Sequence, residues 1–169
     1  MRVFISVPIT GPILRKIKDF RAENPDLKVR WLFDHNLHIT LLPPVELNQN
    51  DLNFVISALT NIPLPRPFEI KFDEIELGPT SNNPRLIQAT GEESVELSNL
   101  KSTIEKTLKF KPDRKFKPHI TLARFRQDQI PNFTTSRVHW KMLVNNFTLM
   151  ESELLPTGAE YTVLKTFNF

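Results

Sequence analysis

The chain has 169 residues, of which 40% are hydrophobic and 24% charged. This composition excludes a disordered chain, and the length favours one domain over residues 1–169. The absence of cysteine excludes disulfides and thiolate metal sites, and a formal charge of +3 with a pI near 9.3 favours anionic partners only weakly.

Membrane attachment and export are not expected from the sequence. No stretch approaches the roughly 18 apolar residues that a membrane span requires. The first ten residues, MRVFISVPIT, lack the length and the small-residue cleavage site of a signal peptide. We therefore expect a cytoplasmic protein.

The first half of the chain alternates predicted strands and helices. Residues 2–8 are β-branched and aromatic, which predicts a buried strand, and apolar residues recur at helical spacing over 12–23. Two short extended segments are predicted at 28–33 and 37–42. A second helix should begin at Asp51, whose carboxylate is typical of a helix N-cap.

The second half continues as a mixture of strands and one helix. Strands are predicted at 68–77 and 85–90, followed by a helix that Ser94 would cap. The basic loop KPDRKFKP connects this helix to an extended segment at 119–122. The remaining sequence is rich in β-forming residues, especially over 145–155 and 160–169.

The tetrapeptide HITL occurs twice, at residues 38–41 and 119–122, although the chain has only four histidines. At average residue usage, the chance that a given His precedes Ile-Thr-Leu is on the order of one in a few thousand. Strands and helices are mixed along the chain, and the copies are separated by about half its length, so we expect an α+β fold with two similar lobes. We read the other histidines, His35 and His139, as surface residues.

Each HITL motif combines core residues with reactive ones. In a strand, His38 and Thr40 would share one face, and His119 and Thr121 would share one face in the second copy. Two imidazoles in one cleft can divide acid and base catalysis, while hydroxyls and cations hold phosphate oxygens. This pattern favours phosphoryl transfer without a metal, although a single His-x-Thr is usually an ordinary strand.

With these motifs, the chain resembles the two-histidine phosphoesterase superfamily, and within it the LigT-like RNA 2′,3′-cyclic phosphodiesterases, also called 2′-5′ RNA ligases. The resemblance includes NLHITL, PHITLAR, the start MRVFISVP, the central PRLIQATGEES and the end SELLPTGAEYTVLKTF. It departs after the first motif, where Leu42, Pro43 and Pro44 replace the usual Phe-Leu-Gly. It implies two lobes, each an antiparallel sheet with helices on its outer face, around a central groove.

The resemblance also implies an activity. The expected reaction is hydrolysis of an RNA or nucleotide 2′,3′-cyclic phosphate to a 2′-phosphate, with reversible 2′-5′ joining of tRNA halves. No metal or nucleotide cofactor is expected, and the protein should act as a monomer. His38 would donate a proton to the departing 3′ oxygen and His119 would activate water, while Thr40 and Thr121 would bind the phosphate.

Further substrate contacts are expected around the second motif. Arg124 matches an Arg that often follows this motif in the family, but strand alternation turns it away from His119 unless a bulge lies near Ala123. Lys115 and Lys117 precede His119 in the basic loop and share its parity.

The rings of Phe4 and Tyr161 are candidates for stacking on the base.

Two other functions remain open from the sequence. One is a phosphodiesterase for a small nucleotide such as ADP-ribose cyclic phosphate. The other is an RNA-binding module without turnover, which a broken motif would mark; neither copy is broken.

Overall fold

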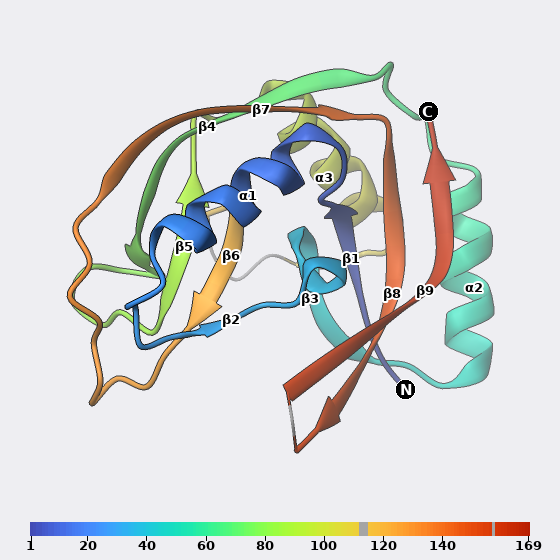
Figure 1. Cartoon of the computed structure of the whole chain (residues 1–169). Helices are drawn as coiled ribbons and strands as arrows, with labels where there is room; N and C mark the ends of the chain where they lie inside the picture. Colours follow the sequence, from blue (N-terminus) through green and yellow to red (C-terminus); the bar gives the residue numbers. More distant parts are fainter. Residues whose placement is uncertain (112–114, 157) are drawn as a thin grey trace.

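The computed structural model describes residues 1–111, 115–156 and 158–169, and within these ranges the chain forms nine strands, three α-helices and one 3-10 turn (Figure 1). The elements in chain order are β1 (Arg2–Pro8), α1 (Pro12–Glu23), β2 (Arg30–Trp31), η1 (Asp34–Asn36), β3 (His38–Glu46), α2 (Gln49–Thr60), β4 (Phe68–Gly78), β5 (Leu86–Thr90), α3 (Val95–Thr107), β6 (His119–Arg124), β7 (Ser136–Val144), β8 (Asn146–Leu155) and β9 (Gly158–Asn168).

Most predicted elements are present, with two corrections. Of the extended segment 28–33, only Arg30–Trp31 forms a strand, β2, because it pairs only with the last two residues of β6. Asp51 is not the N-cap of α2; Asn48 is, and its side chain accepts from the Asp51 backbone N–H at 3.0 Å while donating to the Asp51 carboxylate at 2.7 Å. This reciprocal pairing starts the helix earlier. Part of the predicted basic loop, residues 112–114, lies outside the described residues.

The strands form one antiparallel sheet in the order β7-β4-β5-β6-β3-β1-β8-β9, with β2 added beside β6. This order divides into two four-stranded halves, β7-β4-β5-β6 and β3-β1-β8-β9, that meet at the two HITL strands. A single residue pair, Ile39 opposite Ile120, joins β3 to β6. The predicted α+β class, with two similar lobes, is therefore confirmed.

The two HITL strands share an irregularity as well as a sequence. Each strand contains a β-bulge at the fourth position of the motif, at Leu41 against β1 and at Leu122 against β5. Burial follows the same order from each histidine: half-buried, buried, half-buried, buried, buried. Because a bulge changes which face the following side chains occupy, the repeat is a structural duplication that extends beyond four letters.

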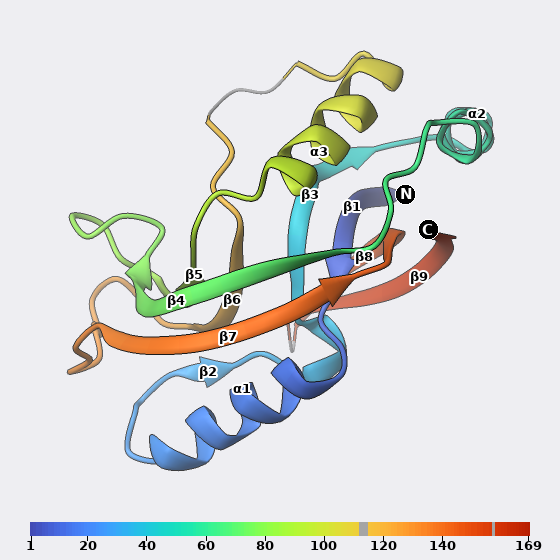
Figure 2. The same cartoon turned by 90° about the horizontal axis from the view of Figure 1, so that it is seen from above.

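The helices cross between the halves of the sheet. Helix α1 follows β1 but contacts β7 in the other half, and α3 follows β5 but contacts β3. Figure 2 shows α1 on the opposite side of the strands from α2 and α3. Phe20 of α1 meets Trp140 of β7 edge to face, with ring centroids 6.4 Å apart. These crossings hold the halves together beyond the single pair of β3 and β6.

Among the described residues, no helix combines the length and the apolar character needed to cross a membrane.

We expect Ile120→Ala to lower the free energy of unfolding by about 3 kcal/mol, since it removes a fully buried side chain where the halves meet. Chemical denaturation measures the loss. The control is Leu143→Ala, which truncates a side chain that is 62% exposed and should change stability by less than about 0.5 kcal/mol. Equal effects of the two substitutions would contradict a central role for this contact.

Candidate functional site

The two HITL motifs place their polar side chains on one face of the sheet. Ile39 and Ile120 lie directly opposite each other on β3 and β6, and both are fully buried. Because side chains alternate along a strand, the residues flanking each isoleucine project to the other face. We call the face that carries His38, Thr40, His119 and Thr121 the histidine face; four residues from distant parts of the chain meet there.

Backbone carbonyls orient both imidazoles in the same way. Nδ1 of His38 donates to the Asn36 carbonyl at 2.8 Å, and Nδ1 of His119 donates to the Lys117 carbonyl at 2.9 Å. A carbonyl can only accept, so Nδ1 carries the proton and Nε2 is the nitrogen that can exchange one. Nε2 of His38 lies 3.1 Å from the Thr40 hydroxyl. The two histidines therefore share one tautomer, with the proton on Nδ1.

Aromatic rings enclose His38. Its ring centroid lies 5.0 Å from that of Phe4 and 5.3 Å from that of Tyr161. Burial disfavours the imidazolium and lowers the pKa of His38 below 6.5, and the positive charges of His119 and Arg124 lower this pKa further, although the Asn36 carbonyl opposes the shift. His38 is therefore mainly neutral at pH 7 in the unliganded protein.

The predicted aromatic contacts Phe4 and Tyr161 both lie beside His38 but differ in exposure. Phe4 is only 3% exposed and packs against Tyr161, with ring centroids 4.8 Å apart. Its ring therefore supports the imidazole. Tyr161 is half-buried and lines a neighbouring pocket. Direct stacking of either ring on a base stays a prediction.

A β-bulge turns Arg124 toward the histidine face. On β5, Gln88 lies opposite Thr121 and Leu86 lies opposite Arg124, with the extra residue Leu122 between them on β6. Since Gln88 and Leu86 are two residues apart on β5, Thr121 and Arg124 share a face although they are three apart. The bulge that Arg124 required is therefore present.

The corresponding position in the first motif holds no cation. Arg124 is the fifth residue after His119, and the fifth after His38 is Pro43, which follows the matching bulge at Leu41. Pro43 is half-buried and has neither a charge nor a backbone N–H. The two motifs thus differ in charge at this position, because only the second motif has an arginine there.

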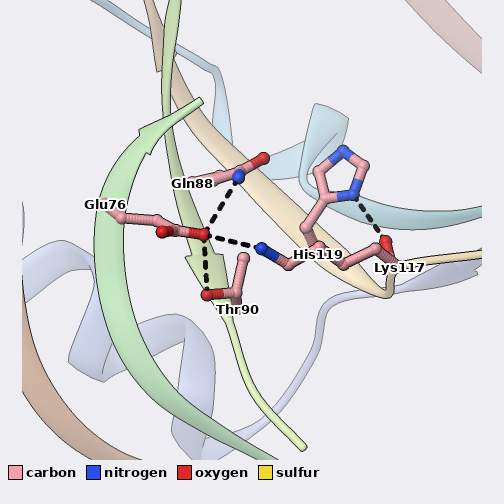
Figure 3. Close-up of polar contacts among 5 residues, drawn as sticks. All are labelled: Glu76, Gln88, Thr90, Lys117 and His119. Atoms are coloured by element: carbon pink, nitrogen blue, oxygen red, sulfur yellow. Dashed lines mark hydrogen bonds and ion pairs between the residues drawn. The ribbon is translucent and has the colours of Figure 1, made fainter. Parts of the chain in front are cut away.

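A hydrogen-bonded network lies beside His119 (Figure 3). Oε1 of Glu76 accepts from Lys117 Nζ at 3.0 Å, Thr90 Oγ1 at 3.1 Å and Gln88 Nε2 at 3.2 Å. Burial alone would raise the pKa of Glu76, but the ammonium of Lys117 and the hydrogen bonds from Thr90 and Gln88 outweigh it and lower the pKa. Glu76 therefore remains ionised at neutral pH.

The network includes the side chain of Lys117, which the sequence predicted to contact the substrate. The ion pair with Glu76 holds the Lys117 ammonium, and the carbonyl of the same residue orients His119. Substrate binding by Lys117 stays a prediction, as it does for Lys115, which is exposed. Sequence reasoning missed Glu76, Gln88 and Thr90, although polar residues at alternate positions of the buried segment LIQAT could have indicated a polar face.

A small pocket, which we call the aromatic pocket, borders the histidine face next to Tyr161, whose ring packs against His38. Its lining includes Trp31, Phe33, Asn36, Arg124 and Tyr161. The aromatic rings offer apolar faces, and Arg124 supplies a positive charge, which together suit a planar base attached to an anionic group. The sequence did not single out Trp31 and Phe33, since an aromatic residue in a strand is usually part of the core.

The other histidines are surface residues, as predicted. His35 is exposed in η1 and stacks on Phe33, and His139 is exposed on β7. In the part of the chain that the structure describes, no group of three or more His, Cys, Asp or Glu side chains is placed to hold a metal ion.

Comparison with known proteins identifies the family. Residues 3–88 and 90–161 match the family model described as LigT like Phosphoesterase. The chain belongs to the LigT-like phosphoesterase family. A protein of Archaeoglobus fulgidus named RNA 2′,3′-cyclic phosphodiesterase is 30% identical to this LigT-like phosphoesterase over 99% of both chains.

Solved structures share the fold of this LigT-like phosphoesterase. TT0787 of Thermus thermophilus superposes with a TM-score of 0.87 at 26% identity, covering 99% of this chain and 97% of that chain. LigT of E. coli, in a complex with 3′-AMP, superposes with a TM-score of 0.81 at 24% identity over the same shares. The similarity to LigT of E. coli shows a common fold.

In this LigT-like phosphoesterase, we expect Glu76→Ala to lower the free energy of unfolding by about 2 kcal/mol, because Gln88 and Thr90 are buried and lose their acceptor. Denaturation at pH 7 measures the loss. The pKa of Glu76 is lowered on folding, so the difference from the unsubstituted protein should shrink as the pH falls below 4.5.

Glu74→Ala is the matched control for Glu76→Ala. Glu74 lies on the same strand and pairs with Arg137, whose side chain is 78% exposed. An exposed ion pair contributes little, so this substitution should cost less than about 1 kcal/mol. A larger loss from Glu74→Ala than from Glu76→Ala would contradict the role assigned to the network.

Titration of the imidazoles by NMR should show a pKa for His38 below 6.5 in the unliganded protein. Arg124→Gln removes one of the positive charges that disfavour the imidazolium, so the pKa of His38 should rise. A pKa for His38 that is unchanged or lower in the variant would show that Arg124 does not act on this ring.

Proposed function

We propose that this protein hydrolyses the 2′,3′-cyclic phosphate at the 3′ end of RNA to a 2′-phosphate. The observation that carries the proposal is the placement of two histidines on one face through the Ile39 and Ile120 pair, each with Nδ1 held by a carbonyl. The named activity of the Archaeoglobus fulgidus relative supports it.

The chemistry requires one proton to be removed and one to be supplied. A water oxygen attacks the phosphorus while a base takes a proton from that water. The bond from phosphorus to the 3′ oxygen then breaks, and an acid protonates this oxygen to give a 3′-hydroxyl. The phosphate remains attached through the 2′ oxygen. Two imidazoles on one face can serve both ends of this in-line displacement.

In our proposal His119 is the base and His38 is the acid. His38 must then be protonated when substrate is present, although its pKa is lowered in the unliganded protein. A bound cyclic phosphate is negatively charged, and it would offset the positive charge of Arg124 and the cost of burial, raising the pKa of His38. Binding of substrate would thereby produce the imidazolium that donates to the 3′ oxygen.

The remaining groups of the histidine face would hold the phosphate. The hydroxyls of Thr40 and Thr121 can donate to its non-bridging oxygens, and the guanidinium of Arg124 can balance the charge that develops there. Hydroxyls, a guanidinium and two imidazoles supply binding, proton transfer and charge stabilisation together. We therefore propose a mechanism that requires no metal.

The same arrangement supports ligation, which is the same displacement with a different nucleophile. If the 5′-hydroxyl of a second RNA replaces water as the nucleophile, attack on the cyclic phosphate yields a 2′-5′ linkage and a free 3′-hydroxyl. The base and the acid keep their positions. We propose that halves of a tRNA are the substrates of this ligation. We also propose that the enzyme is cytoplasmic and acts as a monomer.

Incubation with 2′,3′-cyclic mononucleotides and with oligonucleotides ending in the same group tests the proposal. We expect a 2′-phosphate product, and His38→Ala and His119→Ala should each lower kcat/KM by at least about a hundredfold, as for the loss of a general acid or base. EDTA should not inhibit. Chromatography against authentic 2′- and 3′-phosphates identifies the product.

His139→Ala is the matched control, because it removes an exposed imidazole on β7. It should not alter turnover by more than about twofold. A 3′-phosphate product, strict dependence on added metal, or full activity of the His38 or His119 variant would refute the mechanism. Turnover of a small substrate such as ADP-ribose cyclic phosphate without turnover of RNA ends would reassign the substrate.

A further inference from the structure

A second depression, larger than the aromatic pocket, is lined by positive charge. It has a volume of about 620 Å³, and its lining includes Lys28, Arg30, Arg85, Arg124, Phe125 and Arg126. No carboxylate is among the described residues that line it. We call it the basic depression. The whole chain has a formal charge of only +3, so five cations around one hollow are a local concentration that the average charge does not require.

Strand pairing forces these cations together. Arg30 of β2 lies directly opposite Arg124 of β6, and Leu86 of β5 lies opposite Arg124 on its other side. The backbone N–H of Phe125 donates to the carbonyl of Arg85 at 3.1 Å. Like charges directly opposite one another on paired strands destabilise a sheet. A cost of this kind is typical of a binding site, where an anion offsets the repulsion.

Neighbouring carboxylates offset only part of this charge. Arg126 forms a two-point ion pair with Asp128, with distances of 2.9 and 2.8 Å. Over the described ranges, no ion pair joins Lys28, Arg85 or Arg124 to a carboxylate. Exposed cations of this kind release counterions when they bind a polyanion, which favours association.

The basic depression is continuous with the proposed active site. It shares Arg30 and Arg124 with the aromatic pocket, and that pocket includes Tyr161. The ring of Tyr161 packs against His38. A strand that leaves the histidine face through the aromatic pocket would therefore enter the basic depression next.

We propose that the basic depression binds the sugar-phosphate backbone of the RNA strand on the 5′ side of the terminal nucleotide. This inference rests on the proposed function, since it assumes that the strand's 3′ end occupies the histidine face. Phosphates would contact Lys28, Arg85 and Arg126, and the half-buried ring of Phe125 offers a surface for a base. The protein then distinguishes a strand from a mononucleotide by the phosphates beyond the terminal one.

Binding of a fluorescent ten-residue RNA ending in a 2′-phosphate, measured by anisotropy, tests the proposal without requiring turnover. The double variant Lys28→Gln with Arg85→Gln should raise the Kd by at least about tenfold at moderate salt. It should also reduce the slope of log K against log salt by about 1.4, or about 0.7 for each lost phosphate contact. Affinity for a mononucleotide 2′-phosphate, measured by competition, should be unchanged.

The matched control is Arg66→Gln with Lys165→Gln, which removes two exposed cations that line neither hollow. It should leave the Kd for the RNA within about twofold, because these charges make no phosphate contact. In the opposite direction, Asp128→Asn releases Arg126 from its ion pair and should strengthen RNA binding. The control pair lowers the net charge without changing the basic depression. Asp128→Asn changes the basic depression without removing a cation from it.

The outcomes separate this inference from the proposed function. Equal RNA binding by the double variant and its control would overturn the basic depression as a strand site, as would an equal loss of mononucleotide affinity. Hydrolysis of a cyclic mononucleotide is assayed in parallel on the same proteins. If the unsubstituted protein does not hydrolyse it while the double variant still binds RNA weakly, the proposed reaction fails and the strand site stands.

Discussion

The contact between Ile39 and Ile120 is the constraint on which the arrangement of this protein depends. In the described part of the chain, it is the one residue pair that joins the two halves of the sheet as neighbouring strands, and both side chains are fully buried. Burial of these isoleucines on one face leaves the flanking His and Thr of each motif on the other. A contact that belongs to the core thereby sets the relative position of the two imidazoles, and the crossed helices α1 and α3 keep the halves from separating.

The duplicated halves are similar in backbone but differ in charge. The bulges at Leu41 and Leu122 correspond, yet the residue that each one turns toward the histidine face is Pro43 in one half and Arg124 in the other. Behind the second motif lies the ionised Glu76, whose charge Lys117 balances, whereas His38 is enclosed by aromatic rings. His38 and His119 therefore lie in different environments although their side chains are chemically identical. A pair of histidines that divides acid and base catalysis requires such a difference. The difference between the halves also places the positive charge on the side where the basic depression continues.

Much of the local structure was predictable from short-range patterns. Apolar spacing located α1 and α3, Ser94 was correctly assigned as the cap of α3, and alternation indicated β4. Asp51 was misassigned because Asn48 and Asp51 can each begin a helix, and the choice depends on their mutual hydrogen bonds. Trp31 and Phe33 were missed because an aromatic side chain in a strand looks the same in sequence whether it packs inward or lines a pocket.

The sequence by itself determined the chemistry available to this protein: two repeated His-x-Thr units, no thiols and an excess of cations near the second unit. It also determined that the His and Thr of each unit share one face, since alternation along a strand is a local property of the backbone. The face of Arg124 depended instead on the bulge at Leu122 in the pairing of β6 with β5. Only the tertiary structure decided that the two units are neighbours, that Glu76 engages Lys117, and that Arg30, Arg85 and Arg124 surround one hollow. These relations depend on which strands pair and in what register, and pairing between distant segments is set by burial of the whole core.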